Sequence, residues 1–172
     1  MKRWILPFLL TLTFYFESVF VEFLPEKIFG QEWILVPRFL IILLMIMGIS
    51  YFRNRTLIYA AVFGLLFDIY FNEIIGVYLV LFPIGVYISS KLMKYIFANF
   101  FTVFLLSMIS LSFIEILIYG MNILVLRKHM IFDEFVMIRL VPTLILNAIF
   151  LIIIYFPFNR FLMNLKKEEM NE

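Results

Sequence analysis

The sequence contains no cysteine and a single histidine, His129, among its 172 residues. Disulfide bonds, thiolate metal sites and cysteine nucleophiles are therefore excluded, and one isolated imidazole does not indicate a metal site. The phosphate-binding signatures GxxxxGK[ST] and GxGxxG are also absent, so the sequence gives no indication of nucleotide binding. No serine stands in a nucleophile motif, and no histidine accompanies the serines of the apolar segments. We therefore expect no catalytic residue and no cofactor.

Charge is scarce as well. Only 15% of the residues are charged, 65% are hydrophobic, and the mean hydropathy is +1.08. A soluble domain is closer to half apolar, so this composition excludes an ordinary soluble fold. The charges lie mostly between long apolar runs, which indicates a helical membrane protein with several spans. A period-two alternation typical of membrane barrels is missing, and the net charge of +2 does not indicate nucleic-acid binding.

The apolar runs predict an all-α integral membrane bundle of six transmembrane helices joined by short loops, in a single domain. The expected spans are residues 4–23, 33–52, 56–71, 74–89, 95–119 and 135–158. A span needs about 20 apolar residues, and the third and fourth are shorter, so a thinner bilayer or a partly re-entrant hairpin would accommodate them. Residues 159–172 are expected to form a charged, frayed cytoplasmic tail.

Lysine and arginine are distributed unevenly among the expected loops, which predicts the orientation of the bundle. With the N-terminus inside, nine of the 14 basic residues fall in inner segments and three in outer loops. The inner residues are Lys2, Arg3, Arg53, Arg55, Lys91, Lys94, Arg160, Lys166 and Lys167, and the outer ones are Lys27, Arg127 and Lys128. We therefore expect both termini in the cytoplasm. The basic N-terminal head and its apolar run lack a cleavage site, so we interpret them as a retained first helix.

Apart from Glu22 at the end of the first span, five charged residues fall inside the expected spans: Glu17, Arg38, Asp68, Glu115 and Arg139. A charge at mid-bilayer costs roughly 3 kcal/mol or more, so such residues usually face protein, water or a partner charge. Projected at about 1.5 Å per residue, all five fall in the outer half of the membrane. In one interpretation they form a polar cluster that fixes the bundle or binds a ligand or partner. In the other, the arginines and Glu115 reach the membrane interface. In the second case only Glu17 and Asp68 would be truly intramembrane.

The segment Gly64–Tyr87 holds the most informative of these charges. Ala60, Gly64 and Asp68 recur every four residues, so they share one stripe of a helix. Small residues on that stripe would let a second helix approach closely, and the aspartate would then face this neighbour rather than lipid.

The same segment carries the spacing Gly-x3-Asp-x7-Gly, formed by Gly64, Asp68 and Gly76, followed by a stretch with Tyr78 and Pro83. Set in apolar helices, this motif resembles that of the rod shape-determining MreD family. The chain length, the six-span layout, the acid-bearing first helix and the short loops also fit. The sequence departs from the family's usual small or glycine-rich turn at residues 71–73.

The resemblance implies a non-enzymatic scaffold subunit of the bacterial cell-elongation complex, located in the inner (plasma) membrane with several spans. Its implied partners are MreC, MreB, RodA, the elongation transpeptidase and membrane lipids, and its implied role is to position lateral-wall peptidoglycan synthesis. The family is also similar in fold to the substrate-binding subunits of energy-coupling-factor transporters. A vitamin-binding subunit is therefore the alternative, and it would need an outward pocket with several hydrogen-bonding side chains.

Overall fold

The computed structural model describes residues 4–23, 33–71, 75–93, 95, 99–125 and 131–171. Over these residues the protein is all-helical, without a strand. The elements are α1 (Ile5–Phe23), α2 (Phe39–Ser50), α3 (Arg53–Phe71), α4 (Val77–Leu92), α5 (Phe100–Leu124), α6 (Phe132–Glu134), the π-helix η2 (Phe135–Leu140) and α7 (Val141–Asn171). The predictions made for Lys2, Arg3, Lys27, Asn72, Glu73, Lys94, Arg127, Lys128 and His129 lie outside the described residues.

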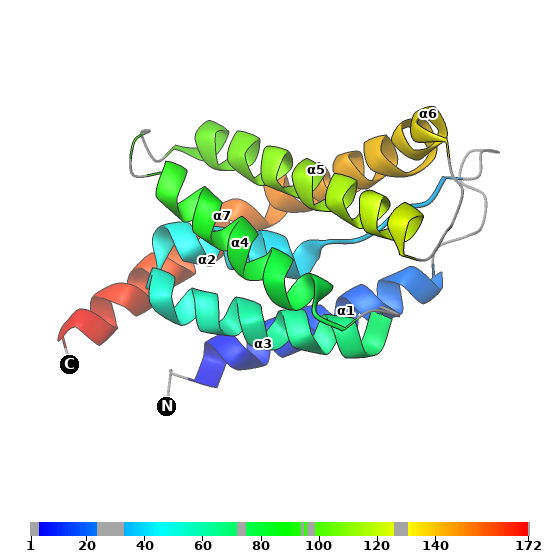
Figure 1. Ribbon diagram of the computed structural model, residues 1–172. Helices are drawn as coiled ribbons and strands as arrows, with labels where there is room; N and C mark the ends of the chain where they lie inside the picture. The colour runs from blue at the N-terminus through cyan, green and yellow to red at the C-terminus, as the bar shows by residue number, and fades with distance from the viewer. Residues whose placement is uncertain are drawn as a thin grey trace.

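Successive long helices run in opposite directions, and the start of α1 and the end of α7 lie toward the same side of the molecule (Figure 1). Helix α2 occupies the centre, where it packs against α1, α3, α4, α5 and α7. Its residues from Phe39 to Gly48 are all buried. A helix that is apolar on every side is stable only when it is surrounded, and α2 has that composition.

The helices present apolar side chains on their outer faces, with Phe8, Ile58, Ile109 and Ile153 all more than 60% exposed. Three stretches are long and apolar enough to cross a membrane by length and composition: Ile5–Phe23, Phe100–Leu124 and Phe132–Asn171. Helices α2 and α4 are apolar but shorter, at 12 and 16 residues. Such an apolar exterior would be an aggregation hazard in water and is suited to lipid.

The second expected helix begins later than predicted. The structure leaves residues 33–38 outside any helix or strand, as an extended trace (Figure 1), and starts α2 at Phe39. Pro37 explains the difference, because proline disfavours the helical conformation at the residue before it and cannot donate a backbone hydrogen bond. The fifth helix likewise begins at Phe100 rather than residue 95, since the Asn99 side chain accepts a hydrogen bond from the Thr102 N–H at 2.8 Å and caps it.

The prediction of a frayed tail at residues 159–172 is wrong, because α7 continues as a helix to Asn171. Leu162 and Leu165 on this extension are buried. Near its end, Glu169 accepts a hydrogen bond from the Tyr51 hydroxyl at 2.6 Å and forms an ion pair with Arg55. The charged end of the chain is therefore anchored to the turn between α2 and α3.

Helices α3 and α4 pack closely at Gly64, as its stripe of small residues predicts. A Cβ atom at Gly64 would overlap the backbone carbonyl of Tyr78 on α4 and lie 3.0 Å from the Cα of Leu79. Ala60 and Asp68, the other members of the stripe, are fully buried.

We expect Gly64→Ala to force α3 and α4 apart and to lower the free energy of unfolding by about 1–3 kcal/mol. Gly120→Ala on α5 is the matched control, because a Cβ there meets no atom within 4 Å. That change should be neutral or slightly stabilising, since alanine favours a helix. Denaturant titrations of both variants in mixed micelles measure the difference, and equal stabilities would contradict the close packing.

Candidate functional site

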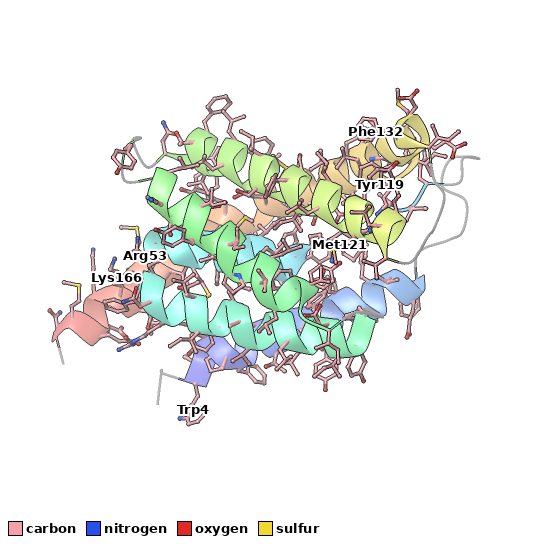
Figure 2. The ribbon with its side chains drawn as sticks, in the orientation of Figure 1. Trp4, Arg53, Tyr119, Met121, Phe132 and Lys166 are labelled. Atoms are coloured by element: carbon pink, nitrogen blue, oxygen red, sulfur yellow. The ribbon has the colours of Figure 1, made fainter. Side chains whose placement is uncertain are left out.

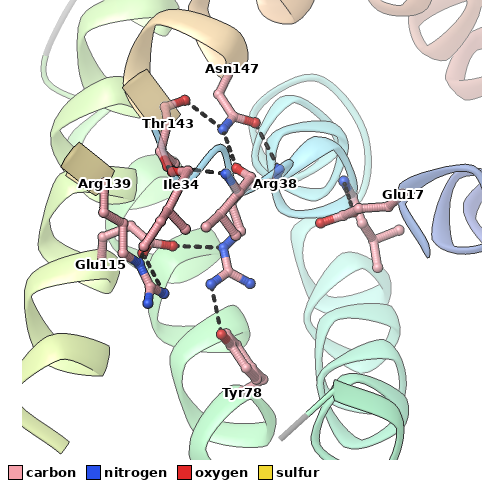
Figure 3. A network of polar contacts seen from close by, with 10 residues as sticks. Glu17, Ile34, Arg38, Tyr78, Glu115, Arg139, Thr143 and Asn147 are labelled. Carbon is pink, nitrogen blue, oxygen red and sulfur yellow. Dashed lines mark hydrogen bonds and ion pairs between the residues drawn. The ribbon is translucent and has the colours of Figure 1, made fainter. Parts of the chain in front are cut away.

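A buried ion-pair network joins three elements at the end of the bundle where α2 begins (Figure 3). Glu115 on α5 accepts from the Arg38 Nε at 2.7 Å through one carboxylate oxygen and from the Arg139 Nη2 at 3.2 Å through the other. Arg38 also donates from Nη2 to the Tyr78 hydroxyl at 2.7 Å, with its guanidinium 4.9 Å from the centre of that ring. One carboxylate thus serves two arginines from distant parts of the chain.

The protein itself surrounds two of these charges. Glu115 is fully buried and Arg38 is 4% exposed, as a polar cluster inside the bundle requires. The Arg139 side chain is 21% exposed and lies at the edge of the network. An uncompensated charge in such a position would be costly, so the three groups depend on one another.

The extended segment 33–38 obtains its backbone hydrogen bonds from side chains of α7. The Asn147 amide accepts from the Arg38 N–H at 2.8 Å and donates to the Val36 carbonyl at 2.9 Å. The Thr143 hydroxyl lies 3.2 Å from the Val36 nitrogen and 3.3 Å from the Ile34 carbonyl. Irregular backbone at membrane depth is tolerated only where protein satisfies its polar groups, which is what Thr143 and Asn147 do here.

The π-helix η2 supplies one further bond to this segment. The Ile34 N–H donates to the Ile138 carbonyl at 2.8 Å, inside η2. The wider turn of a π-helix disturbs the usual backbone pattern, and short π segments often occur at functional positions. The segment 33–38 and the π-helix η2 therefore satisfy part of each other's backbone hydrogen bonding.

Glu17 on α1 caps the N-terminus of α2. Its Oε2 accepts from the Leu40 N–H at 3.1 Å, one of the backbone donors that the first turn of a helix leaves unpaired. The side chain is buried, and its Oε1 has no hydrogen-bond partner among the residues that the structure describes. The carboxyl group also lies at the positive end of the α2 dipole.

Asp68 caps the N-terminus of α4 in the same way, but it accepts three hydrogen bonds instead of one. Its Oδ1 accepts from the Tyr78 N–H and its Oδ2 from the N–H groups of Gly76 and Leu79, all at 2.9 Å. Gly76 has a φ of 108°, a conformation that favours glycine. The spacing Gly-x3-Asp-x7-Gly thus encodes a close helix crossing at Gly64, a cap at Asp68 and a turn at Gly76.

The structure therefore places the sequence-predicted residues in three related sites rather than one. Arg38, Glu115 and Arg139 lie together, whereas Glu17 and Asp68 each cap a short helix. Each of these two capping acids stands on an earlier helix and reaches the start of a later one. The sequence did not identify Tyr78 as a partner of Arg38. Its position two residues after a turn glycine does not indicate that its hydroxyl would reach an arginine. The two short helices depend on side chains far from them in sequence.

The chemistry of these sites is structural in character. The donors and acceptors around Glu115 are bonded to one another, and the two capping acids face backbone N–H groups. Within the described ranges, no group of three or more His, Asp or Glu side chains is arranged to hold a metal ion. The arrangement can fix the relative positions of helices and can present their outer faces to a partner.

Comparisons with known proteins agree with the motif. A sequence model of the family described as "rod shape-determining protein MreD" matches residues 2–165. The chain is 34% identical over 172 residues to the "Rod shape-determining protein MreD" of Bacillus subtilis (strain 168), with both chains covered completely. No solved structure gives a significant match. The matched region includes every residue of the three polar sites.

Proposed function

The chain belongs to the MreD family of rod shape-determining proteins, and on that premise we propose that it is a non-enzymatic membrane scaffold of the bacterial cell-elongation complex. In this role it binds MreC and helps position lateral-wall peptidoglycan synthesis, together with MreB, RodA and the elongation transpeptidase. The observation that carries the proposal is the family match over nearly the whole chain.

We propose that the protein crosses the plasma membrane six times with both termini in the cytoplasm. The alternating helix directions support this topology (Figure 1). The side chains of Arg53 and Lys166 lie at one end of the bundle, and Tyr119, Met121 and Phe132 at the other (Figure 2). A basic end of this kind is expected on the cytoplasmic side. In this topology α2 and α4 span the bilayer as short, capped helices.

An apolar groove between α1, α2 and α7 is the surface that we assign to the single transmembrane helix of MreC. It has a volume of about 430 Å³ and is lined by Leu12, Phe16, Leu43 and Ile154, among others. Leu12 and Phe16 are more than half exposed. A transmembrane partner helix inserts side chains into such a groove by van der Waals packing, because lipid supplies no hydrophobic driving force between helices.

The polar sites hold the three helices that form this groove. Glu17 ties α1 to the start of α2, and Asn147 ties α7 to the segment that leads into α2. A scaffold needs such fixed geometry, since a preformed groove loses less entropy when its partner binds. This connection explains why a chain of this family would bury acids inside an apolar bundle.

Leu12→Trp should block the groove and reduce MreC binding by about tenfold, while the protein still reaches the membrane in wild-type amounts. Ile109→Trp is the matched control, because Ile109 is also exposed but lines a smaller crevice, of about 180 Å³, between α4 and α5. Cells that depend on Leu12→Trp should become wide and rounded, and cells with Ile109→Trp should stay rod-shaped. Equal cell widths for the two variants would contradict this docking surface.

The alternative, a vitamin-binding transporter subunit, requires hydrogen-bonding side chains that face an outward cavity. In the structure, the strongest candidates for that task bind one another instead, as Glu115 does with Arg38 and Arg139. The groove formed by α1, α2 and α7 and the crevice between α4 and α5 are lined almost entirely by apolar side chains.

A further inference from the structure

A second cavity lies at the opposite end of α2, where the chain turns into α3. Its volume is about 500 Å³, and its lining is part polar and part apolar. Arg53, Asn54 and Ser90 contribute the polar groups, and Ile49 and Met93 contribute apolar surface. The polar network around Glu115 lies at the other end of the molecule, so this cavity is a separate site.

Arg53 lines this cavity, Lys91 lies against the same Tyr87 ring as Arg53, and Lys166 lies beside the lining residues Tyr51 and Phe52. Arg53 and Lys91 lie 5.7 and 5.5 Å from the centre of the Tyr87 ring, and Lys166 lies 5.6 Å from the centre of the Phe52 ring. Lys166 also lies 3.5 Å from the Tyr51 carbonyl oxygen. Figure 2 shows Arg53 and Lys166 at the same end of the bundle. One cation therefore lines the cavity, and two lysines lie near its lining residues or near Arg53.

Acidic residues neutralise only part of this charge. Arg55 forms an ion pair with Glu169, whereas no carboxylate in the described part of the chain pairs with Arg53 or Lys91. Arg53, the charged residue of the cavity lining, is therefore available to an anion. The cavity also lies beside the first turn of α3, whose backbone N–H groups and dipole favour the same charge.

We propose that this cavity binds the phosphate of an anionic phospholipid headgroup, with Arg53 as the principal contact. Arginine pairs with phosphate oxygens through parallel N–H donors, and the exposed Asn54 amide offers a further hydrogen-bonding group for the headgroup. Ile49 and Met93 provide an apolar surface for the start of the acyl chains. A lipid is favoured over an acidic protein segment because the site is small and joins polar and apolar surface at the membrane boundary.

The inference rests on the proposed membrane topology, which places this end of the bundle at the cytoplasmic headgroups. It does not depend on MreC or on the groove formed by α1, α2 and α7. A failure of the lipid site would therefore leave the docking proposal intact, and a failure of docking would leave the lipid site intact.

The test uses the purified full chain in detergent, equilibrated with equal amounts of phosphatidylglycerol and phosphatidylcholine, with retained lipids counted by native mass spectrometry. We expect the wild-type protein to retain phosphatidylglycerol selectively. Arg53→Gln should reduce this retention about fivefold, as the loss of one basic contact at a membrane surface predicts. Asn54→Trp, which fills the cavity without changing charge, should reduce it as well.

Lys167→Gln is the matched control, because it removes one positive charge from an exposed position that does not line the cavity. It should leave retention unchanged. Equal losses for Arg53→Gln and Lys167→Gln would show general charge attraction and overturn the site. Retention that Arg53→Gln and Asn54→Trp leave unchanged would also overturn it, as would displacement of the lipid by millimolar inorganic phosphate. The lipid site would also be overturned if Arg53→Gln lost a bound cytoplasmic protein while it retained its lipid.

Discussion

Glu115→Leu is expected to lower the free energy of unfolding by about 3–5 kcal/mol, because it leaves two arginines without their counterion. Arg38 is the more affected of the two, since it is 4% exposed and cannot reach water without moving the start of α2. The measurement is a denaturant titration in mixed micelles, with the amount of protein in native membranes as a second readout.

Two further variants separate the loss of charge from the loss of volume. Glu134→Leu makes the same chemical change at an exposed position on α6 and should have little effect. Combining Glu115→Leu with Arg38→Met should recover much of the lost stability, since an apolar replacement of a buried ion pair is often tolerated. Wild-type stability of Glu115→Leu alone would show that the network is not needed to hold the bundle.

Asp68→Ala is expected to lower the free energy of unfolding by about 2–4 kcal/mol, because three backbone N–H groups at the start of α4 lose their acceptor. Asp68→Asn should have an intermediate effect, since one side-chain oxygen remains. We also expect weaker association with MreC, because the loosened hairpin of α3 and α4 packs against central helix α2.

The control for this experiment is Asp133→Ala, which removes an exposed aspartate from α6. It should leave stability and partner binding unchanged. Asp68→Ala could match the wild type in its amount in membranes, its stability to denaturant and the MreC that co-purifies with it. In that case the cap does not support the scaffold.

The sequence predicts much of this architecture because the relevant signals are local. Apolar runs indicate all the long helices, and the four-residue spacing of Ala60, Gly64 and Asp68 predicts a close crossing beside a buried acid. The structure shows both features. Arg139, Thr143 and Asn147 also recur every four residues in the sequence, a spacing that places them on one helix face without indicating what that face contacts.

The remaining features depend on contacts between residues far apart in the chain. Glu17 reaches Leu40, and Asn147 reaches Arg38, across separations that no periodic pattern encodes. The extended segment 33–38 looks like part of an apolar helix by composition, and only Pro37 argues against it. Its conformation is stable because Thr143, Asn147 and the π-helix satisfy its backbone, and these partners become visible only in three dimensions.

Two of the three buried acids share one physical task, and the third balances a buried charge. A short helix that starts inside an apolar bundle exposes unpaired N–H groups where water cannot reach them. Glu17 and Asp68 satisfy such groups for α2 and α4, and Glu115 balances the arginine at the start of α2. The same residues that are expensive in lipid thus permit a compact bundle with interrupted helices.

The proposed scaffold is tested most directly by purifying the tagged chain from the native membranes of its host and identifying bound proteins by quantitative mass spectrometry. We predict enrichment of MreC, followed by other proteins of cell-wall elongation, and a loss of MreC from Leu12→Trp but not from Ile109→Trp. Enrichment of ATPase subunits and a membrane coupling protein, without MreC, would contradict the scaffold and indicate a transporter subunit instead.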